Sequence, residues 1–257
     1  MAELEYIDTH AHLYDKAFDK DRAEMLQRAR DAGLVRVLLP NVDVGTIADL
    51  LALEEASDGL CQAMMGLHPC AVGEDYRTAL DTVRRQLERR AFCGIGEIGL
   101  DNYWDKSRLK EQEDAFLTQV RWAVELGLPV SIHSREATEE ALLLLEREGG
   151  AVRGVFHCFT GTPAQAARIR ELGLCIGIGG VATFPKVHLA GAIREIGLEH
   201  VVLETDAPYL APVPMRGKRN ESAYLVHILD KLAADLSMES ADLGGMFCAN
   251  ARRLFGG

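Results

Sequence analysis

The sequence has little of what marks disordered, fibrous or disulfide-stabilised proteins. Only 8 of its 257 residues are proline, and the balance of 48% hydrophobic to 26% charged residues is typical of a packed globular protein. The six cysteines, at positions 61, 70, 93, 158, 175 and 248, include no CxxC pair. Because several of them lie in apolar stretches, where reduced and buried thiols are common, we expect a cytoplasmic protein.

Targeting and membrane-spanning segments are missing as well. The N-terminal stretch MAELEYIDTH carries acidic residues where a signal peptide has a basic region, and no apolar region follows it. The longest uncharged stretch, Leu172 to Phe184, contains four glycines and is well short of the ~20 apolar residues that a membrane span requires. We therefore expect no secretion and no association with a membrane.

Positive charge is also scarce. The 28 basic side chains are outnumbered by 39 acidic ones, which leaves a net charge of −11. Long-range attraction to nucleic acid or to an anionic membrane is not expected from such a surface, so a phosphate-bearing substrate would need positive charge at its own binding site. No segment indicates an obligatory protein partner, and a monomer is the default expectation.

Short apolar runs rich in β-forming residues alternate with longer helix-like segments along the whole chain. Eight such runs are centred near residues 7, 38, 64, 95, 131, 155, 177 and 203, and their mean spacing of about 28 residues fits one βα unit. Apolar residues recur at helical spacing in the segments 21–32, 79–90, 108–126, 163–172, 221–237 and 241–255.

Eight strands in this length favour a closed (β/α)8 TIM barrel of the α/β class over an open doubly wound sheet, which usually has fewer strands. We predict one domain over residues 1–257. Gly33, Gly127 and Gly173 each stand just before a predicted strand and fit the left-handed residue that ends a helix.

Candidate metal ligands lie at or near the ends of the predicted strands. The first strand ends in DTHAH, residues 8–12, and alternate side chains of an extended chain point the same way, so His10 and His12 can reach one metal ion. Asp8 shares their face and could hydrogen-bond to one of these imidazoles on the side away from the metal. The remaining candidates each belong to a different strand: Glu97, His133, His157 and Asp206. Because strand ends converge at the C-terminal face of a barrel, we predict one metal centre from these six residues.

Six nitrogen and oxygen ligands exceed the four of a closed structural zinc site, which indicates two divalent ions with open positions. A carboxylate can bridge two ions, and Glu97 is the best candidate because its flanking glycines allow close backbone approach. Crowding at a barrel strand explains those glycines equally well. Asp206 could bind one ion and accept the proton of the attacking water. Glu204, on the same face, is either a support for the site or a buried structural residue.

Several cations and one further histidine are placed to meet a substrate. His68 follows the third predicted strand, in GLHP, and is either a substrate contact or a loop residue. Arg135 lies two residues beyond the histidine of the fifth strand. Arg216 and Arg219 belong to a cationic loop, RGKRN, that could hold a phosphate, and a solvated surface loop is the alternative.

Two aromatic residues follow the strand of the candidate bridging carboxylate. Tyr103 and Trp104 could stack on a base or a sugar, or pack against the barrel rim. By contrast the run VRRQLERR, residues 83–90, lies on a helix that precedes a strand, and we expect it to be a solvated face outside the barrel.

The motifs IDTHAHL, GLHP, GEIGLD, IHSR, HCF, ETDAPYLAP and RGKRNE occur in an order and spacing that resembles the TatD family of metal-dependent deoxyribonucleases, within the amidohydrolase-like barrels. The resemblance covers essentially the whole chain. It implies that the divalent-metal ligands are the six residues already singled out: His10, His12, Glu97, His133, His157 and Asp206. In that family the carboxylate takes the bridging place that a modified lysine holds in many related barrels.

The resemblance further implies a cytoplasmic enzyme that hydrolyses DNA, often as a 3′ to 5′ exonuclease, with Mg2+, Mn2+ or Zn2+ as its ions. One departure from the family pattern is visible. Where the family usually continues RNEP, this chain has Ser222, which predicts a less rigid loop. The six metal-ligand positions are not affected by it.

Two other functions remain open on the sequence alone. Two-metal hydrolysis suits amide, ester and aminoacyl bonds as well as phosphodiesters, and the acidic net charge without an extended basic stripe favours such substrates over long nucleic acid. A barrel that keeps its metal but has lost activity could instead act as a scaffold. The presence of all six ligands argues against that second alternative.

Overall fold

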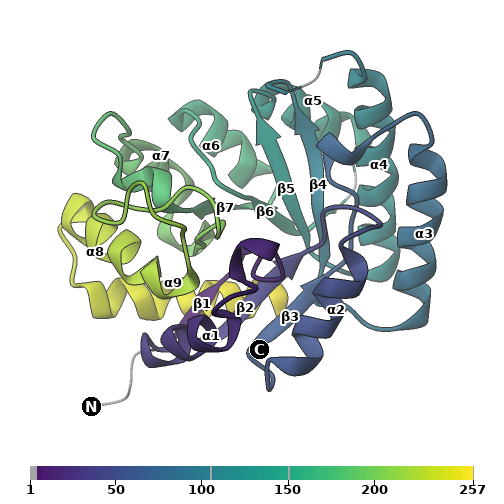
Figure 1. Cartoon of the computed structure of the whole chain (residues 1–257). Coiled ribbons are helices and arrows are strands. Elements are labelled where there is room, and N and C mark those ends of the chain that lie inside the picture. Colours follow the sequence, from purple (N-terminus) through teal and green to yellow (C-terminus); the bar gives the residue numbers. More distant parts are fainter. Residues whose placement is uncertain (1–4, 105, 150, 257) are drawn as a thin grey trace.

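The computed structural model describes residues 5–104, 106–149 and 151–256, and in these residues parallel strands are surrounded by helices (Figure 1). Each of the eight predicted runs forms a strand. The strands are β1 (Tyr6–Asp8), β2 (Leu34–Pro40), β3 (Cys61–Met64), β4 (Ile95–Asp101), β5 (Val130–Arg135), β6 (Gly154–Phe156), β7 (Cys175–Ile178) and β8 (Val201–Leu203).

Helices alternate with these strands and cover the outside of the sheet. They are α1 (Arg22–Asp31), α2 (Ile47–Ala56), α3 (Tyr76–Arg89), α4 (Leu109–Leu126), α5 (Thr138–Glu148), α6 (Pro163–Glu171), α7 (Ala190–Ile196), α8 (Leu225–Leu236) and α9 (Ser240–Phe255). Gly33, Gly127 and Gly173 all have a positive φ just after a helix, as predicted. Among the described residues no helix combines the length and the apolarity that a bilayer span needs.

Backbone contacts close the sheet into a barrel. β1, β2 and β3 form one set of parallel neighbours, and β4 to β8 form another. Met64 pairs in parallel with Gly94 across the gap between β3 and β4. Across the gap between β8 and β1, the N–H of Thr9 donates to the carbonyl oxygen of Leu203 at 3.0 Å. The prediction of a (β/α)8 barrel is therefore confirmed.

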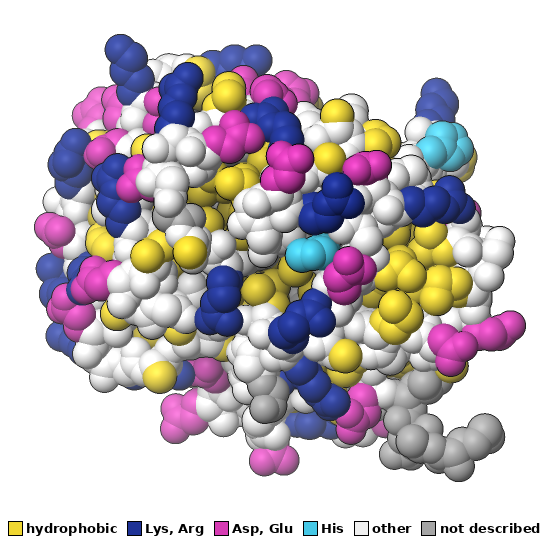
Figure 2. Space-filling model, turned by 180° about the vertical axis from the view of Figure 1, so that it is seen from behind, with side chains coloured by type: hydrophobic (Ala, Val, Ile, Leu, Met, Phe, Trp, Pro, Cys, Tyr) yellow, Lys and Arg dark blue, Asp and Glu magenta, His cyan; other side chains and the backbone are white. Residues whose placement is uncertain are grey.

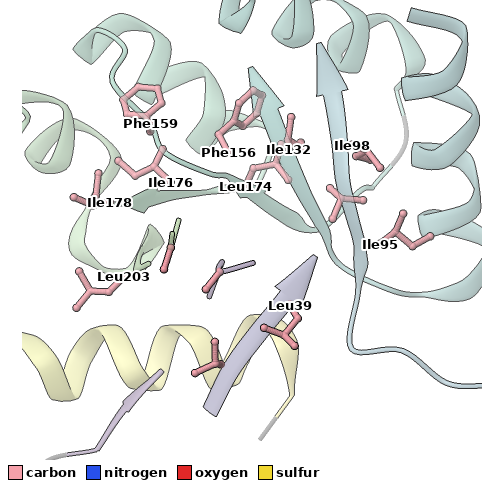
Figure 3. Packing of buried hydrophobic residues seen from close by; sticks show 14 of the residues in the cluster. Leu39, Ile95, Ile98, Ile132, Phe156, Phe159, Leu174, Ile176, Ile178 and Leu203 are labelled. Atoms are coloured by element: carbon pink, nitrogen blue, oxygen red, sulfur yellow. The ribbon is translucent and has the colours of Figure 1, made fainter. Parts of the chain in front are cut away.

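Apolar side chains from neighbouring strands pack side by side in the main core (Figure 3). Ile132 of β5, Phe156 of β6 and Ile176 of β7 are fully buried there. Burial of each such side chain is worth about 1.5–3 kcal/mol relative to exposure. Since these contacts join consecutive strands, they fix the positions from which the strand ends project.

Helix α9 closes the N-terminal end of the barrel. Its Cys248, Ala251 and Phe255 pack in a smaller cluster with side chains from β1, β2, β3, β6, β7 and β8, and Figure 1 shows the helix passing behind β1 and β2. Asn250 donates from Nδ2 to the carbonyls of Leu198 and Val201, where β8 begins. The C-terminal ends of the strands are left for the functional site.

Candidate metal centre

All six predicted metal ligands come together inside the C-terminal end of the barrel. Their side chains are at most 15% exposed. His10 and His12 follow β1, and His157 and Asp206 follow β6 and β8. Glu97 is the third residue of β4 rather than at its end, so its carboxylate lies deeper in the barrel than the sequence pattern indicated.

Glu97 is the centre of the arrangement, with imidazoles against both of its carboxylate oxygens. Oε2 lies 3.2 Å from His10 Nε2 and 3.4 Å from His12 Nε2. Asp206 Oδ1 completes this side, 3.8 Å and 3.6 Å from the same two nitrogens.

The other oxygen of Glu97 has a separate set of neighbours. Oε1 lies 2.8 Å from His133 Nδ1 and 2.8 Å from His157 Nε2. His68 Nε2 is 3.3 Å from the same oxygen. The two groups of ligand atoms therefore share one carboxylate, which is the arrangement that a bridging residue requires.

Hydrogen bonds behind the rings decide which imidazole nitrogens face the carboxylate as acceptors. Tyr14 donates its hydroxyl proton to the carbonyl of Pro40 at 2.6 Å, so the same oxygen accepts from Nδ1 of His12 at 3.0 Å. Nε2 of His12 is then left with a lone pair.

His133 is oriented in the same way from the other side. Its Nε2 lies 2.9 Å from Oδ2 of Asp101. Burial opposes ionisation of Asp101, but hydrogen bonds from His133 and from the N–H groups of Trp104 and Tyr103 hold the pKa of this carboxyl below its usual range. An ionised Asp101 accepts from Nε2, which turns the lone pair of Nδ1 toward Glu97.

These contacts bring ring nitrogens against one another, which is the observation that tests the fit to a metal. The Nε2 atoms of His10 and His12 face each other at 3.3 Å, and His133 Nδ1 and His157 Nε2 face each other at 3.2 Å. Only a proton or a metal ion between such atoms relieves their repulsion. Neutral imidazoles and carboxylates are the usual ligands of divalent ions in hydrolases, so the donor set fits.

The electrostatics of the cluster favour an ionised bridge. Burial opposes protonation of His12, His133 and His157, but the carboxylates around them raise the pKa of all three rings, that of His157 well above its ordinary value. Burial opposes ionisation of Glu97, but the imidazoles of His68, His157 and His10 hold its pKa well below the usual range. Burial lowers the pKa of His10 well below its ordinary value. Burial also raises the pKa of Asp206, to about 6.

Comparisons with known proteins agree with this geometry. A family model described as TatD-related DNase matches residues 7–256. The chain belongs to the TatD-related DNase family. It is therefore a metal-dependent hydrolase of the α/β barrel type, and the resemblance drawn from its motifs is confirmed.

Relatives within the TatD family match nearly full length. The metal-dependent hydrolase YabD of Bacillus subtilis is 34% identical over 96% of this chain and 98% of its own length. The 3′-5′ ssDNA/RNA exonuclease TatD of Pantoea ananatis is 35% identical over 97% of this chain and 98% of its own length. The crystal structure of the TatD homologue YjjV of Escherichia coli superposes with a TM-score of 0.92 at 30% identity, covering 99% of both chains.

His68 lies closer to the metal-binding groups than the sequence indicated. It was expected to contact substrate or to shape a loop, and it does shape the loop, because its Nδ1 accepts from the N–H of Cys70 at 3.0 Å. Its Nε2 forms a potential metal-binding group with Glu97 and His133. Its ring also packs edge-on against that of His133, at 4.6 Å between centroids.

A cavity of about 560 Å3 opens beside the ligands. It is lined by the three ligand residues His133, His157 and Asp206 and also by Arg135, Thr138 and Thr160. Arg135 is thus placed where the sequence predicted a contact with substrate. Arg216 lines a separate groove of about 410 Å3, where its guanidinium carbon lies 3.9 Å from the centre of the Phe184 ring.

Arg219 is not brought to the site, and this expectation is corrected. Both of its terminal nitrogens donate to Asp21, at 2.6 and 2.8 Å, and one also donates to the carbonyl of Ala17. With these donors engaged, the guanidinium joins the loop after β8 to the segment that precedes α1.

Two further expectations about supporting residues are corrected. Asp8 holds no imidazole; its carboxylate accepts from the N–H and the hydroxyl of Thr205, and from the hydroxyl of Ser222 at 2.6 Å. Ser222 does not loosen its loop, because it is fully buried and makes this bond.

Glu204 is fully buried. Its Oε1 accepts a hydrogen bond from the N–H of Cys158 and lies 3.7 Å from Nδ1 of His157, so the carboxylate lies behind the metal-facing ring.

The glycines around Glu97 reflect close packing. A Cβ on Gly96 would lie 2.9 Å from Cβ of Ser131, and one on Gly66 would lie 2.8 Å from the backbone of Gly96. Crowding between strands, one of the two explanations left open, is therefore present. It also lets Glu97 sit at the centre of the barrel.

Proposed function

We propose that this TatD-family hydrolase is a divalent-metal-dependent 3′-5′ exonuclease acting on single-stranded DNA. One observation carries the proposal: both oxygens of the buried Glu97 face imidazole nitrogens, at 2.8–3.4 Å, in two groups. A carboxylate so placed is suited to join two ions. The name of the Pantoea ananatis relative, an exonuclease of single-stranded DNA and RNA, supports this choice of substrate and polarity.

His10, His12 and Asp206 would hold one ion together with Glu97. His133 and His157 would hold the other, again with Glu97. A pair of divalent ions, Mg2+, Mn2+ or Zn2+, supplies Lewis acidity toward the phosphate and lowers the pKa of water.

The chain's own side chains complete the reaction. Asp206 lines the cavity, and its side chain is 13% exposed, so it can reach the attacking water and accept its proton. Arg135 lines the same cavity and would orient the phosphate by charge-assisted hydrogen bonds. Glu97, at 3% exposure, is shielded from bulk water and would hold the ions without taking part in proton transfer.

Positive charge at the site would offset the negative net charge of the protein. Figure 2 shows basic and acidic side chains interspersed over one face, without an extended stripe of either sign. Divalent ions concentrated in a narrow cavity would attract phosphate at short range although the protein carries −11 overall. We therefore expect the protein to bind short single-stranded ends of DNA as its substrate. We also propose that it acts in the cytoplasm as a monomer.

Digestion of end-labelled single-stranded DNA tests this function. The protein is freed of metal by chelation, Mg2+, Mn2+ or Zn2+ is restored, and Glu97→Gln is assayed alongside. Progressive shortening from the 3′ end by the wild type, reduced at least about 1,000-fold in Glu97→Gln, is the expected result. Absence of cleavage with every ion would exclude the nuclease.

Hydrolysis of an amide, ester or aminoacyl bond is the second candidate, and the lining of the cavity favours it. Three glutamates, Glu136, Glu139 and Glu140, stand beside Arg135 there, which is unfavourable for a long polyanion. The salt dependence of DNA binding separates the two candidates. A nuclease loses affinity steeply with added salt, whereas a negligible slope favours the acyl substrate.

A further inference from the structure

Two aromatic side chains beside the cavity are left largely in solvent. Tyr103 is 49% exposed, and Trp104, at 69%, is the most exposed large apolar side chain in the described part of the chain. Their rings meet edge to face, with centroids 4.9 Å apart. Packing against the barrel rim, one of the two roles considered from the sequence, does not cover these rings. The exposed part of each ring is available to a ligand.

Asp101 fixes the backbone of these residues to the metal centre. Its Oδ1 accepts from the N–H groups of Tyr103 at 2.8 Å and of Trp104 at 3.0 Å, while its Oδ2 contacts His133 Nε2. The N–H of the intervening Asn102 donates to the carbonyl of Arg135 at 3.0 Å. The two aromatic residues are thus held in place by the same carboxylate that orients a metal-facing imidazole.

Arg135 adds a positive charge to the aromatic pair. Its guanidinium carbon lies 3.8 Å from the centre of the Tyr103 ring and 5.3 Å from that of Trp104. Within the described residues it forms no ion pair. A guanidinium stacked on a ring keeps its N–H donors free at its edge, where they can bind phosphate. We call Tyr103, Trp104 and Arg135 the aromatic rim.

A planar apolar surface next to a free cation matches the chemistry of an unpaired nucleotide, which offers a flat base and an anionic phosphate. The aromatic rim meets the hydrolytic cavity through Arg135, which lines that cavity together with His133. A base paired within a duplex is already stacked on its neighbours and cannot lie on these rings. A free base can.

We propose that the aromatic rim is a stacking site for the unpaired nucleobase next to the scissile phosphodiester, with Arg135 binding the adjacent phosphate. This assignment rests on the proposed nuclease function and names the residues that would give it a preference for single strands. It predicts that one base close to the cleaved bond contributes to binding through Trp104 and Tyr103.

Removal of single bases from the substrate tests the proposal. Single-stranded oligonucleotides with one baseless nucleotide, moved position by position past the cleaved bond, are digested by the wild type and by Trp104→Ala. In the wild type, a missing base at one position should raise KM about 10-fold or more. In Trp104→Ala the same substrate should raise KM less than about 2-fold, because the ring on which that base would stack is absent. Trp104→Phe should restore most of the wild-type response.

Met246→Ala is the matched control, since Met246 is an apolar side chain on α9 that is 39% exposed and outside the cavity. It should respond to base removal as the wild type does. Equal responses of the wild type and Trp104→Ala at every position would overturn the stacking site while the nuclease stands. If the wild type cleaves no oligonucleotide with any ion, the nuclease function itself fails, and the stacking site with it.

Fluorescence gives a readout that does not depend on cleavage. The chain has two tryptophans, so Trp122→Phe leaves Trp104 as the reporter, and Glu97→Gln in the same chain prevents digestion. Saturating thymidine oligonucleotide should quench Trp104, and an oligonucleotide of baseless nucleotides should not. Equal signals from the two ligands at saturation, judged by anisotropy of a labelled strand, would contradict stacking.

Discussion

Two of the metal-facing imidazoles depend on a second side chain that selects the tautomer. Tyr14 does this for His12, and Asp101 does it for His133. Such partners fix ring orientation and typically change metal affinity 10–100-fold when they are lost. The chemistry of the site therefore rests on residues that the metal need not touch.

Asp101→Asn tests this dependence with a minimal change. The amide keeps Oδ1 as an acceptor for the N–H groups of Tyr103 and Trp104, but its NH2 group replaces the oxygen that faces His133. That ring must then accept at Nε2 and carry its proton on Nδ1, toward Glu97. We expect affinity for one divalent ion to fall about 10- to 100-fold, measured by calorimetric titration. Unchanged affinity for both ions would show that the ring is oriented by other contacts.

Ser222→Ala tests the hydrogen bond that replaces the family's usual proline. Asp8 is completely buried, and burial raises its pKa to about 7, so each donor to its carboxylate matters. Removing the hydroxyl should lower the free energy of unfolding by about 1–3 kcal/mol, measured by urea denaturation. Thr78→Ala, which removes an exposed hydroxyl, is the matched control. A loss below about 0.3 kcal/mol at Ser222 would contradict the assigned role.

The sequence located the metal-facing residues because barrel strands converge, but it did not locate their supports. Tyr14 and Ser131 carry no motif, and only the fold brings Ser131 Oγ within 2.9 Å of His10. Asp101 could have been predicted, because it lies four residues after Glu97 in the sequence and on the same face of the strand. Arg219 was misplaced because Asp21, its partner, lies 198 positions away in the sequence.

At the level of elements, strand β4 is tightly constrained by its neighbour β5. Gly99 has a φ of +139°, and a Cβ there would lie 2.0 Å from the carbonyl oxygen of His133 on β5. Neither the conformation nor the space permits a side chain. The flanking glycines that suggested a bridging carboxylate are thus also required by strand packing.

Gly99→Ala should therefore destabilise the protein strongly, by more than about 3 kcal/mol, because β4 and β5 must separate. Gly245→Ala on α9 is the matched control, since nothing lies within 4 Å of a Cβ there. It should stabilise the helix by about 0.5–1 kcal/mol. Thermal unfolding of both variants checks the pair, and equal effects would refute the packing argument.

The order of elements could be read from the sequence because each apolar run and each helical period is local. The contacts that close the barrel between β8 and β1, and those that place α9 across its bottom, could not be read from the sequence. Asn250 on α9 bonds to the start of β8, and Thr9 joins β1 to β8, through contacts that no periodicity reports. The helix that closes the bottom of the barrel was predicted as a helix, but its place came only from the structure.

At the scale of the whole molecule, metal binding and folding should be coupled, because the ligands come from five strands or strand ends around the barrel. Ions that bind only the folded chain stabilise it by about 2.7 kcal/mol at a concentration 100 times the dissociation constant. Chelation should lower Tm by several degrees in the wild type and much less in Glu97→Gln. An identical shift in both proteins would mean that the stabilising ions bind elsewhere.

The central claim is that Glu97 joins two divalent ions in one site, and counting the bound metal tests it most directly. Wild-type protein, Glu97→Gln and the exposed control Glu125→Gln are saturated with Zn2+ or Mn2+, freed of excess ion and measured by elemental mass spectrometry. We predict two ions per chain in the wild type and in Glu125→Gln, and one or none in Glu97→Gln. A single ion in the wild type, or two ions retained by Glu97→Gln, would contradict the account.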